Sequence, residues 1–135
     1  MPYLTWNSSY ELGIESIDKQ HRKLVDLLND FYSNIKNRTN TEIIYTLISG
    51  MKEYVIMHQR FEIEMLRKYG FEFTDEHDKE HAAFIQKIND IEKRQKMGFA
   101  VVSYEITDFL KKWLQEHILI QDKKIAPFLK SKGAR

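Results

Sequence analysis

The stretch IYTLISGMKEYVIMHQRFEIEM, residues 44–65, carries the pattern that decides the fold. Apolar side chains recur in it at steps of three and four, which is the spacing of one face of an α-helix. That stripe holds, in order, Ile44, Ile48, Met51, Val55, His58, Glu62 and Met65. We therefore expect a long amphipathic helix whose inward face includes an imidazole and a carboxylate. Gly70 is its natural end, since glycine commonly terminates helices.

Three further stretches of the chain show the same period. They predict helices over about Asp18–Lys36, from Thr74 or Asp75 to near Gly98, and over about Val101–Ile120, with a short amphipathic piece ending near Leu129. Short connections between long helices favour antiparallel neighbours. The predicted fold class is therefore all-α: an antiparallel up-down-up-down four-helix bundle with an extended N-terminal arm and a short C-terminal helix.

The predicted domain organisation is a single domain over residues 1–135. Residues 1–17 are expected to form the arm and to pack Trp6 and Ile14 on the bundle, which spans residues 18–129. Residues 130–135 are expected to form a tail that frays from Ser131 onward.

The amino-acid composition of the chain argues against several classes of function. The chain has 135 residues, of which 42% are hydrophobic and 30% charged, a globular balance. Its net charge of +1 argues against nucleic acid or an anionic membrane as partner. The absence of cysteine excludes disulfides, thiolate zinc sites and thiol catalysis. No signal-peptide pattern or apolar run of ~20 residues is present, so a cytoplasmic location without membrane attachment is expected.

All five histidines lie on the predicted helices, and each is on an apolar stripe. A single histidine on such a face is usually an ordinary core residue. Five of them on four helices, in step with two acids, are hard to explain in that way, because a buried imidazole without partners loses its hydration. Imidazole and carboxylate are ligands for iron, manganese or zinc. Seven donors exceed the need of one ion, so the pattern predicts a two-metal centre from His21, His58, Glu62, His77, His81, His117 and Asp122.

Spacing sorts these donors. His58 and Glu62 are four residues apart, as are His77 and His81, so each pair shares one helix face. His117 and Asp122 are five apart, which leaves them ~140° out of register on a regular helix. If both reach the centre, the helix must contain a π-type turn or break after His117. A regular helix with Asp122 in solvent would contradict this prediction.

Other residues near the predicted ligands are assigned less specifically. Phe61, Phe84 and Trp113 are expected to be core side chains, and they are also candidates for the lining of a dry pocket at the metals. Acceptors for the outer histidine nitrogens are expected. Asp18, Gln20 and Glu80 are candidates, although surface exposure is the favoured interpretation for each.

The segment His77-Asp-Lys-Glu80-His81 also fits the His-x-x-Glu-His pattern of inverted zinc peptidases. That hypothesis leaves three histidines unexplained, and a small closed bundle offers no peptide cleft. Zinc content and peptidase activity would distinguish the two.

The whole set of motifs resembles the hemerythrin family, in particular its single-domain bacterial form. The resemblance extends from Trp6 to Leu129 and rests on four pieces in order: Gly13-Ile14-Glu-Ser-Ile17-Asp18-Lys-Gln20-His21, His58-x-x-x-Glu62, His77-x-x-x-His81 and Trp113-Leu-x-x-His117-x-x-x-x-Asp122-Lys-Lys. One departure is Gln59, where many relatives have an aromatic side chain directly after the second histidine.

The resemblance implies two iron ions joined by an oxygen bridge and by two bridging carboxylates, Glu62 and Asp122. It assigns His77, His81 and His117 to a six-coordinate iron. It assigns His21 and His58 to the other iron, which keeps one open position that takes dioxygen reversibly.

The expected function is therefore that of an oxygen carrier or store and not of an enzyme. The expected partner is dioxygen and the expected state is a monomer; an oxygen-accepting protein is a further candidate partner. Alternatives are an oxygen or redox sensor, a di-iron oxidase or a protein that handles peroxide or nitric oxide, and an iron store.

Overall fold

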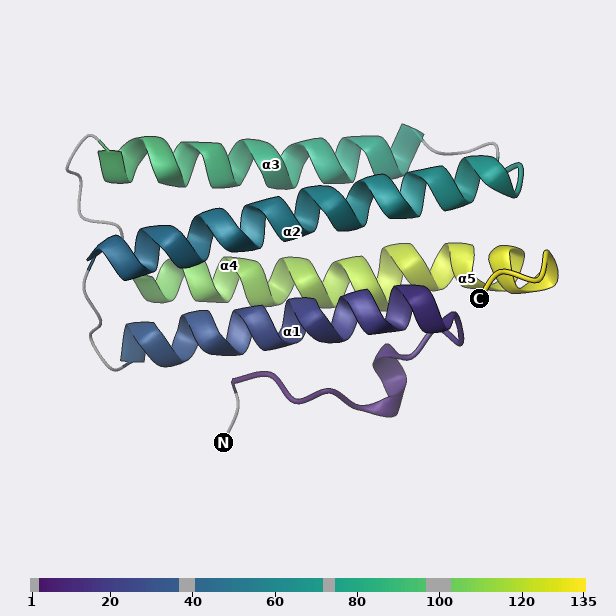
Figure 1. The fold of residues 1–135 in the computed structure, drawn as a ribbon, viewed down its shortest axis with the longest axis horizontal. Helices are drawn as coiled ribbons and strands as arrows, with labels where there is room; N and C mark the ends of the chain where they lie inside the picture. Colours follow the sequence, from purple (N-terminus) through teal and green to yellow (C-terminus); the bar gives the residue numbers. More distant parts are fainter. Residues whose placement is uncertain (1–2, 37–40, 72–74, 97–102) are drawn as a thin grey trace.

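Four long helices lie side by side in a bundle in the computed structural model, which describes residues 3–36, 41–71, 75–96 and 103–135 (Figure 1). Their bounds are α1 Glu15–Lys36, α2 Thr41–Lys68, α3 Asp75–Lys96 and α4 Ser103–Glu116. A π-helical segment, His117–Asp122, continues α4 into the C-terminal helix α5, Lys123–Ser131. The predicted all-α class and four-helix bundle are confirmed.

The first helix begins three residues before the predicted start at Asp18, and the side chain of Asp18 explains why. Its carboxylate accepts hydrogen bonds from the backbone N–H of Leu12 at 2.8 Å and of Gly13 at 3.2 Å. Gly13 has a φ of +84°, a left-handed conformation that glycine adopts without strain. The arm therefore turns sharply at Gly13 and enters α1 at Glu15.

The N-terminal arm packs against the bundle, as predicted. Asn29 of α1 accepts a hydrogen bond from the Leu4 N–H at 2.8 Å and donates one to the Leu4 carbonyl at 2.9 Å. Ile14 is fully buried, and Trp6 packs on the core. A short 3-10 helix, Ser8–Tyr10, interrupts the arm.

The predicted fraying of the C-terminal tail was wrong. Ala134 is buried, and its N–H donates to the Leu129 carbonyl at 3.0 Å. The Ser16 hydroxyl donates to the Arg135 carbonyl at 2.8 Å. The tail is therefore tied to the start of α1 by contacts between segments distant in sequence.

Among the residues that the structure describes, the core consists of two apolar clusters. The larger one fills the bundle around Leu28, Phe31, Val55 and Phe84. The second cluster joins the start of α1, the end of α2 and α5, and its buried residues are Leu12, Ile14, Ile17, Ile63, Leu66, Ile125, Ala126, Leu129 and Ala134. The histidines of α1 and α2 lie in sequence between the residues that these helices contribute to the two clusters.

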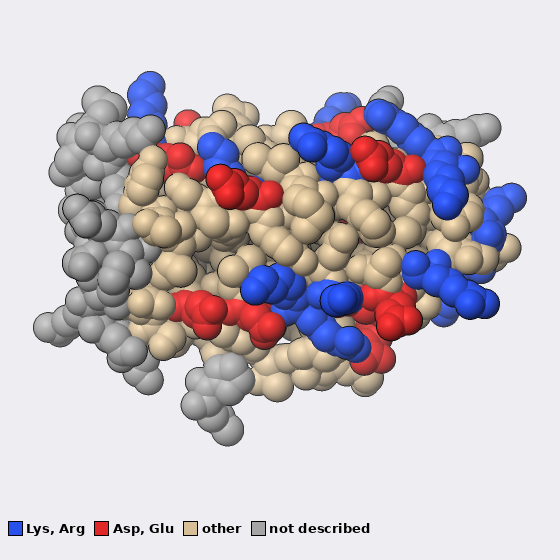
Figure 2. Space-filling model, in the orientation of Figure 1, with Lys and Arg blue, Asp and Glu red and all other residues tan. Residues whose placement is uncertain are grey.

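On the face drawn in Figure 2, acidic and basic side chains are interspersed. Among the described residues, none of the helices is both long and apolar enough to cross a membrane. The predicted ends near Thr74, Gly98 and Val101 lie outside the described residues.

Candidate metal centre

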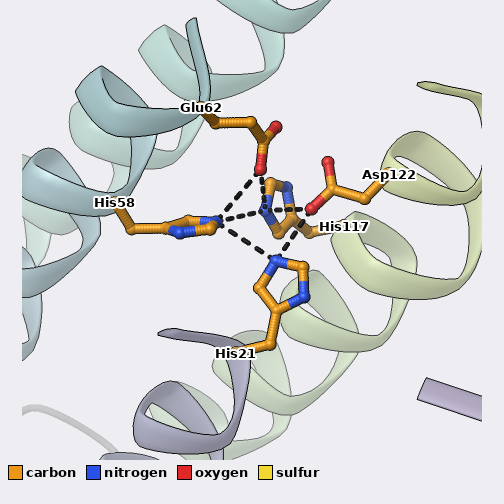
Figure 3. Close-up of side chains that lie close together, drawn as sticks. All are labelled: His21, His58, Glu62, His117 and Asp122. Carbon is orange, nitrogen blue, oxygen red and sulfur yellow. Dashed lines mark hydrogen bonds and ion pairs between the residues drawn. The ribbon is translucent and has the colours of Figure 1, made fainter. Parts of the chain in front are cut away.

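Five of the predicted ligands converge in the middle of the bundle (Figure 3). His21 comes from α1, His58 and Glu62 from α2, and His117 and Asp122 from the π-helical segment. All five are fully buried. One potential ligand atom from each lies within 4.8 Å of the others.

The closest atoms of the cluster are imidazole nitrogens and carboxylate oxygens. His58 Nε2 lies 3.2 Å from His21 Nε2 and 3.0 Å from His117 Nε2. Asp122 Oδ2 lies 2.8 Å from His21 Nε2 and 3.0 Å from His117 Nε2. Glu62 Oε2 completes the group, 3.2 Å from His58 Nε2 and 3.6 Å from His117 Nε2.

The π-helical segment His117–Asp122 confirms the prediction made from the five-residue spacing. A π-turn accommodates one more residue than an α-turn, so residues five apart can share a face. His117 and Asp122 both point inward, whereas Leu119 and Ile120, between them, are exposed.

The surroundings of the buried cluster shift the pKa values of its histidines in opposite directions. Burial lowers the pKa of His21 below 6.5, although Asp122 opposes the shift. Burial also acts to lower the pKa of His117, but Asp122 and Glu62 outweigh it and hold that pKa well above 6.5. Burial and Asp122 act to raise the pKa of Glu62, yet His117 and His58 keep it below its usual value. Without a metal, the cluster therefore retains a proton on His117 where a cation could bind.

Residues from neighbouring helices hold the outer nitrogens of two of these histidines. His58 Nδ1 donates to Gln20 Oε1 at 2.7 Å, and His117 Nδ1 donates to Glu80 Oε1 at 2.8 Å. The favoured expectation that Gln20 and Glu80 are surface residues was wrong, because both are partly buried.

Asp18 was also wrongly expected at the surface; it is buried and binds the backbone of the arm. The sequence does contain a feature that places Gln20 and Glu80 near the predicted ligands. Gln20 directly precedes His21, and Glu80 directly precedes His81. Adjacent residues of a helix are about 100° apart, so each of the two lies beside the inward face, from where it reaches a histidine of a neighbouring helix.

His81, a predicted ligand of α3, is not one of these five residues. His81 is buried, and its Nε2 lies 3.9 Å from Glu62 Oε1. Glu80, His81 and His117 form a second group whose potential ligand atoms lie within 4.8 Å of one another. His77 belongs to α3, but its side chain is outside the described part of the chain.

Apolar and aromatic side chains line one side of the centre. The Trp113 indole stacks on the His117 ring, with centroids 4.9 Å apart and planes 9° from parallel, and Phe84 packs on Trp113 with centroids 4.1 Å apart. Beside them is a cavity of about 10 Å³, close to the minimum that holds one water-sized molecule. Its lining is Leu24, Leu28, Met51, Val55, Phe84, Leu110, Trp113 and Leu114. Phe61, in contrast, packs against the second apolar cluster.

A helical bundle with a buried group of imidazoles and carboxylates is typical of metal-binding proteins. Comparison of the chain with known protein families identifies which family it belongs to. Residues 12–129 match the family model described as the hemerythrin HHE cation binding domain. The chain belongs to the hemerythrin family.

Similar proteins agree with this assignment. The chain is 32% identical to a bacteriohemerythrin of Clostridium acetobutylicum, over 87% of this chain and 95% of the relative. It is 28% identical to a bacteriohemerythrin of Methylococcus capsulatus, over 96% and 98% of the two chains. A crystal structure titled wild-type hemerythrin superimposes with a TM-score of 0.84 and 26% identity, covering 94% of this chain and 98% of that one.

Proposed function

We propose that this protein binds two iron ions and uses them to bind dioxygen reversibly, as a carrier or store and not as an enzyme. Glu62 and Asp122 would bridge the ions. His77, His81 and His117 would complete one metal position, and His21 and His58 the other. The second position would keep a free coordination site for the gas.

The convergence of three imidazole nitrogens carries this proposal. His58 Nε2 faces both His21 Nε2 and His117 Nε2 at 3.0–3.2 Å. Each nitrogen either carries one proton or exposes one lone pair, so the three cannot satisfy one another by hydrogen bonds alone. Because Nδ1 of His58 donates outward, its Nε2 lone pair faces the centre, and Nε2 of His117 would face it in the same way once a bound cation displaces the proton held there.

Charge balance also supports two metal ions. Glu62 and Asp122 are fully buried with their negative charges close together, which is costly unless cations compensate them. Two divalent ions held by these two carboxylates, together with one hydroxide, would leave a nearly neutral site. Such a site is compatible with the surrounding apolar clusters.

Iron supplies the redox chemistry of oxygen binding, and the surrounding side chains favour release over reaction. A ligand set rich in neutral imidazoles stabilises high-valent metal less than the carboxylate-rich sites of ferritin-like bundles do. The apolar lining of Phe84, Trp113 and their neighbours limits the access of water and protons. Both features favour return of the gas unchanged.

The absorption spectrum of the iron-loaded protein tests this function. The anaerobically reduced protein is recorded before air, after air and after removal of oxygen. A visible charge-transfer band that appears with air and vanishes on deoxygenation is expected. The zinc-loaded protein is the redox-inert control and should show no band. Irreversible oxidation with release of peroxide would contradict carriage and favour an oxidase or a sensor.

A further inference from the structure

The two anchored histidines of the centre differ in the chemistry of their outer partners. His58 Nδ1 donates to the neutral amide oxygen of Gln20 at 2.7 Å. His117 Nδ1 donates to the carboxylate of Glu80 at 2.8 Å. The two hydrogen bonds are alike in length and join similar rings, so the main difference between them is the charge of the acceptor.

The Glu80 carboxylate is placed to act mainly on His117. Its side chain is only 15% exposed, so solvent screens its charge weakly. Its second oxygen, Oε2, is buried and has no hydrogen-bond partner among the residues that the structure describes. His21, on the other side of the cluster, has a buried Nδ1 with no hydrogen-bond partner within the same described ranges.

A charged acceptor at Nδ1 of a histidine changes how strongly the other ring nitrogen, Nε2, binds a metal ion. Hydrogen bonds to an ionised group are roughly twice as strong as those between neutral groups. A strong acceptor at Nδ1 draws the proton outward and increases electron density at Nε2, which makes Nε2 a better donor to a cation. Gln20 exerts this effect on His58 only weakly because its amide oxygen carries no net charge.

We propose that Glu80 and Gln20 are positioning residues that make the two metal positions unequal. The position that includes His117 binds a divalent ion first and holds a more highly charged ion more firmly. The position that includes His21 and His58 is the weaker site. This inference rests on the two-metal centre of the proposed function and adds an order of loading to it.

Titration of the metal-free protein with Co²⁺ tests the inference without dioxygen. Calorimetry gives the two stepwise association constants, and the visible spectrum reports coordination, because six-coordinate Co²⁺ absorbs more weakly than five-coordinate Co²⁺. In the unmodified protein, the first equivalent should give the weak spectrum. Glu80→Gln, which can keep the hydrogen bond but removes the charge, should weaken the first step by roughly 10–100-fold and affect the second step less.

The opposite substitution, Gln20→Glu, provides an independent test. Gln20→Glu should strengthen the weaker step, and the exchange variant with both substitutions should bring the two association constants closer together than they are in the unmodified protein. Glu92→Gln is the matched control: Glu92 lies on the same helix, is 13% exposed and pairs with Lys52 at 3.3 Å. It should leave both constants unchanged. Far-UV circular dichroism checks folding, and Gln20→Glu carries the test if Glu80→Gln does not fold.

The outcomes separate this inference from the proposed function. If two ions bind but Glu80→Gln lowers both constants equally or neither, the order of loading is overturned and the two-metal centre survives. An unchanged weaker step in folded Gln20→Glu would also overturn it. If the unmodified protein binds fewer than two Co²⁺ ions, both proposals fail.

Discussion

His117 links the buried cluster to its surroundings. Its Nε2 faces His58 and Asp122 at 3.0 Å, its Nδ1 donates to Glu80, and its ring stacks on Trp113. These contacts give one imidazole a hydrogen-bonding, an electrostatic and a packing role at the same time. Its substitution is therefore the most direct test of the assignment.

We expect His117→Ala to lose at least one of the two metal ions, because it removes a proposed ligand and leaves Glu80 without its hydrogen-bond donor. Metal content per protein, measured by mass spectrometry of the elements, checks this. Glu116→Ala, an exposed neighbour on the same helix, is the control and should keep full occupancy. Full occupancy in His117→Ala itself would refute the ligand assignment.

The pKa values of two histidines predict how the stability of the metal-free protein depends on pH. The pKa of His117 is raised, so its stabilising contribution is complete below pH 6.5 and is lost as pH rises through the raised value. The pKa of His21 is lowered, so stability also falls as pH drops below 6.5, where the unfolded chain takes up a proton that the buried ring does not.

Urea unfolding across this range measures both effects. We expect His117→Gln to flatten the alkaline side of the profile and His21→Gln to flatten the acid side. Equal slopes in the unmodified protein and in both variants would show that these histidines do not govern the pH dependence.

At the scale of the helices, the backbone conformation of two glycines shows where α2 ends and where it continues. Gly70 ends α2 with a φ of +82°, and the N–H of Phe71 donates back to the Leu66 carbonyl at 2.9 Å. Gly50, in contrast, lies in the interior of the same helix, with open space where a Cβ would stand. The two glycines therefore have opposite consequences for the same helix.

Alanine substitution at these positions should change stability in opposite directions. Gly70→Ala should destabilise the protein by about 1–2 kcal/mol, because a Cβ is disfavoured in the left-handed conformation. Gly50→Ala should stabilise it by about 0.5–1 kcal/mol, because alanine loses less backbone entropy in a helix. Urea unfolding of the two variants in parallel measures both, and effects of the same sign would contradict the helix-end role of Gly70.

At the scale of the whole molecule, the polar centre separates two apolar clusters. The fully buried Glu62 and Asp122 carry negative charge into this interior, where it is costly without compensating cations. Bound metal ions would remove that cost and join all four helices of the bundle. The proposed centre is therefore part of the fold as well as the functional site.

Removal of the metal should lower the thermal midpoint of unfolding. An ion that binds only the folded state stabilises it by about 4 kcal/mol when its free concentration is a thousand times its Kd. Differential scanning calorimetry with and without a chelator measures the difference. The same chelator should have a smaller effect on His117→Ala, and an equal effect on both proteins would mean that the stabilising ions bind elsewhere.

Most of the bundle and the composition of the candidate site could be predicted from the sequence, because both depend on local periodicity. Inward faces follow from the 3.6-residue repeat, and the five-residue interval from His117 to Asp122 predicted the π-turn. The order of the helices could be predicted without knowing which helix packs against which. The same holds for the inward direction of four histidines: His21, His58, His81 and His117.

Only the tertiary structure decided which side chains meet across helices. Gln20 reaches His58 and Glu80 reaches His117 over separations of 38 and 37 residues, and Ala134 is buried where the sequence predicted a frayed tail. Such contacts depend on how the helices rotate and pack against one another, which a one-dimensional repeat does not contain. The sequence by itself therefore determined the helices and their inward donors, and packing determined which partner holds each histidine.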